Sequence, residues 1–437
     1  MLSETAMLEM FRISHDLPDA NMEDLLHELS PPISFVSNTT DDHLCVSDVA
    51  LSGMLTEPDE HQRRRWLEEK FEHSARSRIA KEFQAAPDVN EYDGLVPFAG
   101  KDLNPTAGES ISSSRLETYG ICPRRFFLQR GLNIYPPDDW SVDHERWLDP
   151  LQFGNLVHEL FEGFLRGHTA SGLTPCLARD RTPMLQLLYA KIELLKIDIP
   201  IPSLDVFLRQ REQLEAICEI FLNKEEEYCR AHKAMPWILE SSFGVPGEVK
   251  SVLDCNEPIS LTLSDGRSLQ VSGRLDRVDK LMLDGSERYA IWDYKSGSNF
   301  GFGQDKPFGQ GRKLQPYLYV GMLRHRIAAT GGNPDAVHLF GYFFPNPKTE
   351  GLRLYWTQGE LQGGDEVLRH ICDSISSGVF VATTNKDDCA YCDYLSVCGD
   401  PGIVASESLR KATNSVNQVL DPLRRLRNIV AGFEETE

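Results

Sequence analysis

The chain has no long apolar run. No segment approaches the roughly 18 consecutive apolar residues that mark a membrane-spanning helix. The first residues carry Glu4 and Glu9 and one early base, Arg12, so they lack the basic and then apolar order of a secretory signal. We therefore expect a globular, cytoplasmic protein with no membrane partner.

Positive charge is also scarce, since 45 Lys and Arg face 66 Asp and Glu for a net charge of −21. This balance argues against a protein that coats nucleic acid by bulk electrostatics, because phosphate binding needs positive potential. The deficit is uneven: residues 1–50 hold ten acids and one base, so the remainder is closer to balanced. Metal ions held by carboxylates would also present local positive charge to a phosphate.

Two familiar motifs are missing as well. Nothing matches a Gly-x-x-x-x-Gly-Lys-Ser/Thr phosphate loop, so no ATP-driven motor is visible. The ten cysteines do not form a compact, evenly spaced framework, which excludes a secreted disulfide scaffold. Six of them are scattered singly and are expected to be small buried hydrophobes.

What is present is enough for a large core: 437 residues, 41% of them hydrophobic, predict two or three domains. We expect an acidic N-terminal region over 1–105, a central domain over 106–400 and a helical tail over 401–437. Within the first region, the mixed charges from His61 to Glu82 are typical of an exposed or partner-facing helix.

The most informative stretch, residues 271–295, predicts a β-hairpin. Two runs rich in Val, Leu, Ile, Tyr and Trp flank Asp284-Gly285, and an Asp-Gly pair between such runs is a strong hairpin signal. If these two residues form the loop, antiparallel pairing brings Asp276 opposite Asp293. Lys295, two residues further, then shares their face.

Opposed carboxylates repel one another at the roughly 4.5–5.5 Å that separates directly paired Cβ atoms. A bound cation would remove the repulsion, and hard oxygen ligands suit Mg²⁺ or Mn²⁺. A lysine beside such a metal can position or activate a water for attack on a phosphodiester. The alternative is a pair of charged residues on a solvated strand face, and a register slip of one residue would separate them.

Other segments supply candidate partners for this hairpin. His158 borders the apolar stripe of a helix predicted over 149–166, and it is either a metal ligand or an ordinary core or surface histidine. Glu240 lies in a strand region over 237–245. After Lys295, a Gly-rich loop over 296–312 interleaves Phe and basic residues, which suits stacking on bases, although a plain flexible loop fits equally. Gln315 and Tyr319 lie four apart at the start of a helix over 314–329.

Three cysteines near the end form a compact motif, Cys389, Cys392 and Cys398. Three cysteines in ten residues indicate a metal ion or cluster. Tetrahedral coordination needs a fourth thiolate, for which Cys122 is the best candidate. Zinc and incidental cysteines are the alternatives to a cluster.

Taken together, these motifs resemble the PD-(D/E)XK nucleases of the RecB family, and most closely the iron–sulfur nuclease domain of AddB-type recombination subunits. The likeness spans residues 112–399 and rests on six motifs in family order: Ser114-Arg-Leu-Glu-x-Tyr-x-x-Cys122-Pro, Gly154-x-x-x-His158, Gly273-Arg-Leu-Asp276-Arg, Asp293-Tyr-Lys295-x-Gly, Gln315-x-x-x-Tyr319 and Cys389-x-x-Cys392-x5-Cys398.

The resemblance implies a fold and a set of roles. The fold would be α/β, a restriction-endonuclease-like αβββαβ core with a mixed sheet flanked by helices, a helical insertion and termini joined by the cluster. His158, Asp276, Asp293 and the Tyr294 carbonyl would hold the metal, and Lys295 would be the catalytic lysine supported by Gln315 and Tyr319. The four cysteines of the motif would ligate a [4Fe–4S] cluster, and Glu240 would be the acid of the first strand.

The function that follows is metal-dependent hydrolysis of DNA, as an exonuclease, in repair or recombination. The rival is a catalytically silent iron–sulfur module for DNA binding or assembly of a helicase–nuclease complex. Two departures from the family pattern stand out. Pro316 directly follows Gln315, and only about a hundred residues precede the nuclease region, where AddB-type chains carry a large helicase-like region. Residues 1–105 would then be partner-facing or a vestige of that region, and a separate helicase subunit is an expected partner.

Overall fold

The computed structural model describes residues 46–137, 143–247, 251–304 and 306–432, which form two compact units divided between Ala85 and Ala86. The first unit contains α3 (Val46–Leu55), α4 (Glu60–Lys70) and α5 (Glu72–Ala85). The exposed helix expected over 61–82 is two helices, α4 and α5, and none of their described residues is buried.

The second unit begins before the predicted boundary at 105. Backbone hydrogen bonds join Val96 N to Gly378 O and Phe380 N to Gly94 O, each 2.7 Å long. The predicted C-terminal tail also folds onto this unit, where Lys411 forms an ion pair with Asp93. Residues 86–105 and the described part of the tail therefore belong to the same compact body as the central domain.

The second unit is built on a seven-stranded mixed sheet with the order β1-β4-β5-β6-β7, in which β2 and β3 also pair with β4. β1 runs parallel to β4 and β5 runs parallel to β6, while the other pairs are antiparallel. The strands are β1 (Ser110–Ser112), β2 (Met235–Phe243), β3 (Ile259–Thr262), β4 (Ser268–Leu283), β5 (Ser286–Tyr294), β6 (Val337–Phe344) and β7 (Leu352–Thr357).

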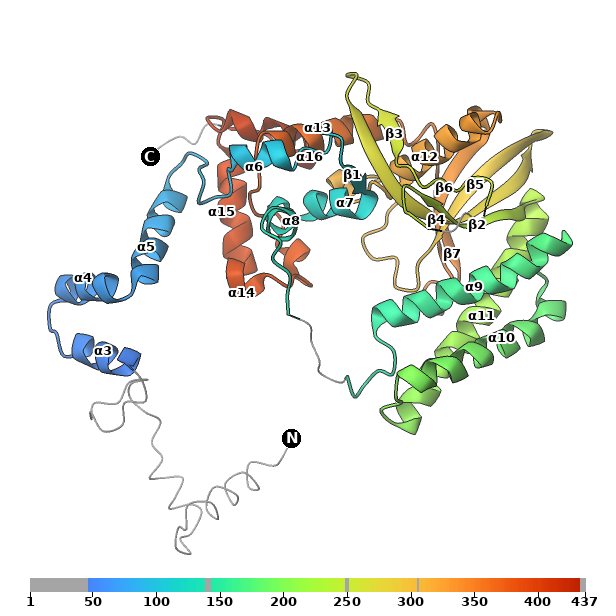
Figure 1. Ribbon diagram of the computed structural model, residues 1–437, viewed down its shortest axis with the longest axis horizontal. Helices are drawn as coiled ribbons and strands as arrows, with labels where there is room; N and C mark the ends of the chain where they lie inside the picture. The colour runs from blue at the N-terminus through green and yellow to red at the C-terminus, as the bar shows by residue number, and fades with distance from the viewer. Residues whose placement is uncertain (1–45, 138–142, 248–250, 305, 433–437) are drawn as a thin grey trace, which may run out of the picture. The chain divides into compact units, whose positions relative to one another are not determined.

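Helices cover both faces of the sheet. The order of helix, β2, β4, β5, α12 and β6 agrees with the predicted αβββαβ core, and α9–α11 form the predicted helical insertion, seen as one layer in Figure 1. The described α-helices are α6 (Pro97–Asp102), α7 (Ser113–Ile121), α8 (Pro123–Arg130), α9 (Pro150–Ser171), α10 (Leu177–Asp198), α11 (Leu204–His232), α12 (Gln315–Ala329), α13 (Gly364–Ser376), α14 (Leu395–Cys398), α15 (Pro401–Thr413) and α16 (Asp421–Arg427). None of them is both long and apolar enough to cross a membrane.

Strand periodicity divides the interior into two hydrophobic cores. Ile291 of β5 enters a core with α7, α12 and α13, whereas its neighbour Trp292 enters a core with α9, α10 and α11. Successive strand residues point to opposite faces, so each strand contributes to both cores. A polar residue on such a strand lies between two packed layers, where its position is well defined.

Candidate active site

The predicted hairpin is present in the predicted register. Pairs run from Leu283–Ser286 at the turn to Arg277–Trp292, and Asp284 and Gly285 have φ values of 51° and 74°. Positive φ at both loop residues is the requirement of a type I′ turn, which Asp-Gly meets well. Beyond the last pair, Asp276 Oδ2 accepts a hydrogen bond of 2.8 Å from Tyr294 N, so the two strand ends stay joined.

Three ligand-type side chains meet beside this strand end. One ligand atom each of His158, Glu240 and Asp276 lies within 4.8 Å of the other two. His158 Nδ1 is 3.3 Å from Asp276 Oδ2, and its Nε2 is 3.1 Å from the Tyr294 carbonyl. Glu240 comes from β2 with a left-handed φ of 50°, an uncommon conformation for a residue with a side chain. The motifs predicted Asp293 for this group, and the structure places Glu240 there instead.

The acids of this group are crowded. Burial, and after it the charge of Asp293, raises the pKa of Asp276 to about 7. Burial, and after it the charge of Asp276, raises the pKa of Glu240 to about 8. A divalent cation would relieve this repulsion, and one imidazole with two carboxylates and a carbonyl is a donor set that fits such an ion.

Asp293 and Lys295 form an ion pair next to the group. Lys295 Nζ is 2.6 Å from Asp293 Oδ2, and the Asp293 side chain is only 5% exposed. Burial by itself would lower the pKa of Lys295, but Asp293 and Asp276 raise the pKa above its ordinary value. Lys295 is therefore a cation at neutral pH, able to orient a water or to stabilise negative charge.

The start of α12 supports this pair despite Pro316. Gln315 is the first residue of α12, and its Nε2 donates to Asp293 Oδ1 at 2.5 Å. Tyr319, one turn further, is buried, and burial raises its pKa to about 12, so its hydroxyl stays protonated. Proline in the first helical turn costs no hydrogen bond, because the amide there has no partner within the helix.

Glu117 has a role that differs from the one predicted from its spacing. It was expected to complete a capping box with Ser114, but Ser112 is the N-cap of α7. The Glu117 carboxylate instead accepts hydrogen bonds from Leu314 N and Gln315 N, at 2.6 and 2.9 Å. It caps α12, a helix almost two hundred residues away, and no local pattern could have indicated this.

The candidate ligands open onto a cleft of about 800 Å³. His158, Glu240 and Asp276 line it, together with further acids from α9 and with Arg274. A space of this size admits an extended ligand and places the carboxylates where a phosphate could reach a bound cation.

Behind the site lies a buried charge network that the sequence motifs did not predict. Arg277, next to Asp276, donates to Asp279 and to Glu225 of α11, and all three side chains have no exposed area. Arg353 of β7 pairs with the same glutamate, and Arg277 also donates to the Tyr294 hydroxyl at 3.2 Å. Position 225 lies in the apolar stripe of α11, and an acid in such a stripe is the signal that could have revealed the network.

The four predicted cysteines, Cys122, Cys389, Cys392 and Cys398, line one small cavity, and all the described cysteines are free. Burial, and after it the three other thiols, raises the pKa of Cys389 to about 11. Among the described residues, His158, Glu240 and Asp276 are the only such group of three within 4.8 Å, so no three of the four sulfurs are that close.

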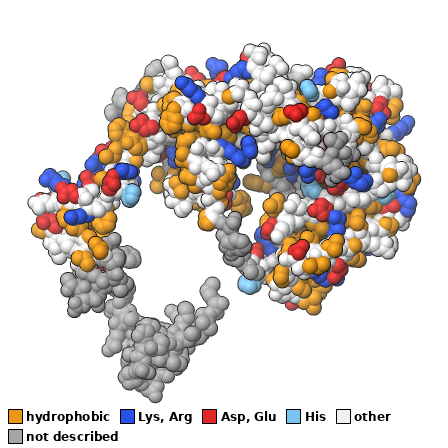
Figure 2. All heavy atoms as spheres, viewed as in Figure 1, with side chains coloured by type: hydrophobic (Ala, Val, Ile, Leu, Met, Phe, Trp, Pro, Cys, Tyr) orange, Lys and Arg blue, Asp and Glu red, His pale blue; other side chains and the backbone are white. Residues whose placement is uncertain are grey.

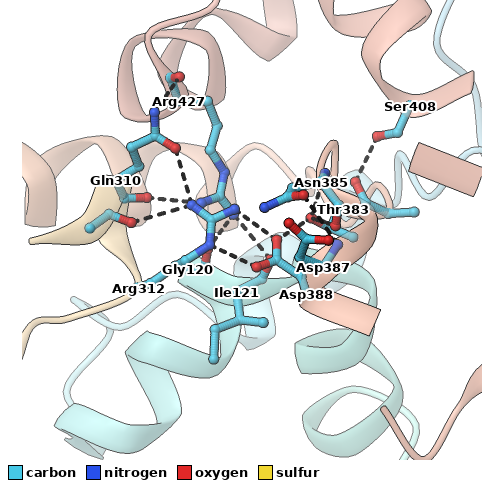
Figure 3. Close-up of polar contacts among 12 residues, drawn as sticks. Gly120, Ile121, Gln310, Arg312, Thr383, Asn385, Asp387, Asp388, Ser408 and Arg427 are labelled. Carbon is cyan, nitrogen blue, oxygen red and sulfur yellow. Dashed lines mark hydrogen bonds and ion pairs between the residues drawn. The ribbon is translucent and has the colours of Figure 1, made fainter. Parts of the chain in front are cut away.

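A polar junction ties this cysteine site to α12 (Figure 3). Arg312 donates to both carboxylate oxygens of Asp388, at 2.8 and 2.7 Å, directly before Cys389. Arg427 of α16 donates to the carbonyls of Gly120 and Gln310. The junction therefore joins the segments before Cys122, before Cys389 and before Gln315.

The mixed sheet, the acidic cleft and the Asp293-Tyr-Lys295 strand end define a nuclease-type site. Residues 110–399 match the family model described as the PD-(D/E)XK nuclease superfamily, and the chain belongs to that superfamily. This agrees with the resemblance on which the fold prediction rested.

The curated relatives share one name, which describes the B-type component of an ATP-dependent helicase/deoxyribonuclease. The chain is 27% identical over 210 residues to the protein of Moorella thermoacetica, which covers 47% of this chain and 17% of the relative. It is 28% identical over 270 residues to that of Clostridium perfringens strain 13, covering 55% and 20%. The chain thus spans a fifth or less of the length of these relatives, which are the AddB-type proteins expected from the motifs.

Proposed function

We propose that the protein is a divalent-metal-dependent deoxyribonuclease that acts as an exonuclease in DNA repair or recombination. The observation that carries the proposal is the meeting of His158, Glu240 and Asp276 within 4.8 Å, beside the Asp293–Lys295 ion pair, in a chain of this superfamily. Positive and negative side chains are mixed over the visible surface (Figure 2), so DNA recognition would rest on local features of the cleft.

Each side chain would have a separate task. His158, Asp276, Glu240 and the Tyr294 carbonyl would hold Mg²⁺ or Mn²⁺, with Asp293 as a further ligand. When bound, the ion would activate a water and neutralise charge on the phosphate. Lys295 would orient that water or stabilise the developing negative charge, and Gln315 would fix the Asp293 carboxylate. Tyr319 would hold the start of α12 against the sheet.

The test is cleavage of labelled single- and double-stranded DNA with Mg²⁺ or Mn²⁺, on linear molecules and on circles of the same sequence. An exonuclease degrades only the linear DNA. Asp293→Asn and Lys295→Met should abolish cleavage and leave DNA binding within a few-fold. Asp284→Asn at the tip of the same hairpin is the control, because Asn tolerates a positive φ. Full cleavage by Asp293→Asn would refute the assignment, and DNA binding without any cleavage by the natural protein would establish the silent-module alternative.

The four cysteines support a [4Fe–4S] cluster in this proposal. A tetrahedral zinc with Zn–S bonds of about 2.3 Å would place neighbouring sulfurs about 3.8 Å apart. The wider spacing found here suits a multinuclear cluster better. Protein purified without oxygen should contain about four irons per chain. Cys122→Ala should be colourless and protease-sensitive, whereas Cys255→Ala, away from the cavity, should be unaffected. Stoichiometric zinc without iron would replace the cluster assignment.

A separate helicase subunit is the proposed partner, since the names of the relatives combine both activities. The expected result is ATP-dependent degradation of duplex DNA only when such a subunit is added. Equal degradation with the chain alone would contradict this part of the proposal.

A further inference from the structure

The segment that follows Lys295 presents one exposed aromatic side chain. The loop between β5 and α12 contains three phenylalanines, and two of them, Phe302 and Phe308, pack against the hydrophobic core. Phe300 differs, because it is 89% exposed. Single exposed apolar residues are common on proteins, so the exposure alone carries no meaning. Its setting does.

Phe300 sits at the corner of a built turn. Phe302 N donates to Asn299 O at 3.0 Å, and Gly301 between them has a φ of 78°. These values define a type II turn with Phe300 at its second position and glycine at its third. A residue at the corner of such a turn projects away from the body of the loop.

Both sides of the turn are fastened to the sheet. On one side, the buried Asn346 donates to Gly297 O at 2.9 Å. On the other, the Phe302 ring packs edge-on against Tyr342 and Phe344, and Trp356 Nε1 donates to Gln304 O at 2.7 Å. The exposed ring is thus held on a braced support. Ordering it against a ligand would cost little conformational entropy.

The position relative to the candidate site is also constrained. Five residues separate Phe300 from Lys295, so their Cα atoms are at most about 18 Å apart. A DNA strand whose phosphate lies at Lys295 would therefore pass Phe300 within a few nucleotides. Every base offers a π-face, but only an unpaired base can leave its own stack to lie on an aromatic ring.

We propose that Phe300 is a stacking platform for a base of an unpaired DNA strand beside the candidate active site. The inference rests on the proposed function and deepens it: it makes the substrate a single strand or a frayed end. The neighbouring cation Lys313, whose Nζ lies 3.9 Å from the Phe302 ring centre, is placed on the same segment to follow the backbone.

The test compares two fluorescent probes of equal charge: a 20-mer of thymidine, and a 20-mer of abasic sites. Binding is measured with Ca²⁺ in place of the catalytic metal. Phe300→Ala should weaken binding of the thymidine strand by about 5- to 100-fold, the range for losing one stacked base. It should leave binding of the abasic strand within twofold. Phe300→Trp should retain affinity, and its fluorescence should be quenched by the thymidine strand only.

Phe98 is the matched control, since it is a phenylalanine of similar exposure, 74%, on α6. Phe98→Ala should bind both probes as the natural protein does. Equal losses for both probes, or no loss for either, would overturn the platform, and the second result would point to a protein partner at Phe300. Failure of the proposed function looks different: base-dependent binding that Phe300→Ala weakens would persist, but no DNA would be cut.

Discussion

Glu225→Gln tests whether the charge network behind the candidate site is balanced as the structure indicates. Glu225 and Asp279 together compensate Arg277 and Arg353, and three of these four side chains have no exposed area. The substitution keeps the shape and removes one negative charge. Arg277 retains its two hydrogen bonds to Asp279, whereas Arg353 loses its only recorded carboxylate.

The expected cost is about 3 kcal/mol in the free energy of unfolding. Removing one partner of a buried ion pair typically costs about 3–5 kcal/mol. The lower end applies because the Arg353 side chain is 13% exposed and lies over the rings of Phe343, Tyr228 and Trp292, at 3.9–4.5 Å. A loss of this size changes the folding equilibrium by about a hundredfold.

Urea unfolding of the full chain measures this, with Glu219→Gln as the control. Glu219 lies on the same helix in a surface pair with Arg181, where the expected loss is about 0.2–1 kcal/mol. Adding Arg353→Met to Glu225→Gln should cost less than the sum of the single changes, since it removes the unpaired charge. Equal losses in Glu225→Gln and Glu219→Gln would refute the reasoning.

Acidity adds a second check on Glu225. Burial alone would raise the pKa of Glu225, but Arg277 and Arg353 hold the pKa below its ordinary value. A lowered pKa in the folded state means that the stabilisation is present above the ordinary pKa and is lost as the pH falls through the folded value. The difference between the natural protein and Glu225→Gln should therefore shrink in acid.

Three further predictions concern the site and its supports. The raised pKa values of Asp276 and Glu240, about 7 and 8, mean that the metal-free protein loses stability as the pH rises from about 4 to 8, so the increase in Tm produced by Mn²⁺ should be larger at pH 8.5 than at pH 6; an increase independent of pH would contradict the crowding of these acids. His158→Asp should lower the ratio of Mn²⁺- to Mg²⁺-supported activity, because oxygen ligands favour the harder ion, and an unchanged ratio would make His158 a packing residue. Arg427→Met should cost about 2–3 kcal/mol in urea unfolding, because it leaves buried carbonyls without donors, whereas the exposed Arg425→Met on the same helix should be nearly neutral; equal effects would mean that the junction adds no stability.

Local patterns were sufficient for much of the fold. The Asp-Gly turn with its flanking β-rich runs predicted the hairpin and its register, because only a turn with two positive φ values joins strands this closely. The apolar stripe of α9 and its Asp149 cap placed His158 on the correct helix. The spacing of Cys389, Cys392 and Cys398 identified one cysteine site, and the structure brings Cys122 to the same cavity.

What the sequence alone determined is therefore what depends on neighbours along the chain: turns, caps, amphipathic faces and compact motifs, together with the family to which these belong. The tertiary structure decided which distant groups meet. Glu240 joins His158 and Asp276 through the pairing of β2 with β4. Glu117 caps α12, and Glu225 joins Arg277 across the sheet. Buried polar groups take whichever partner the packed layers bring within hydrogen-bond distance, and that choice is not written in local spacing.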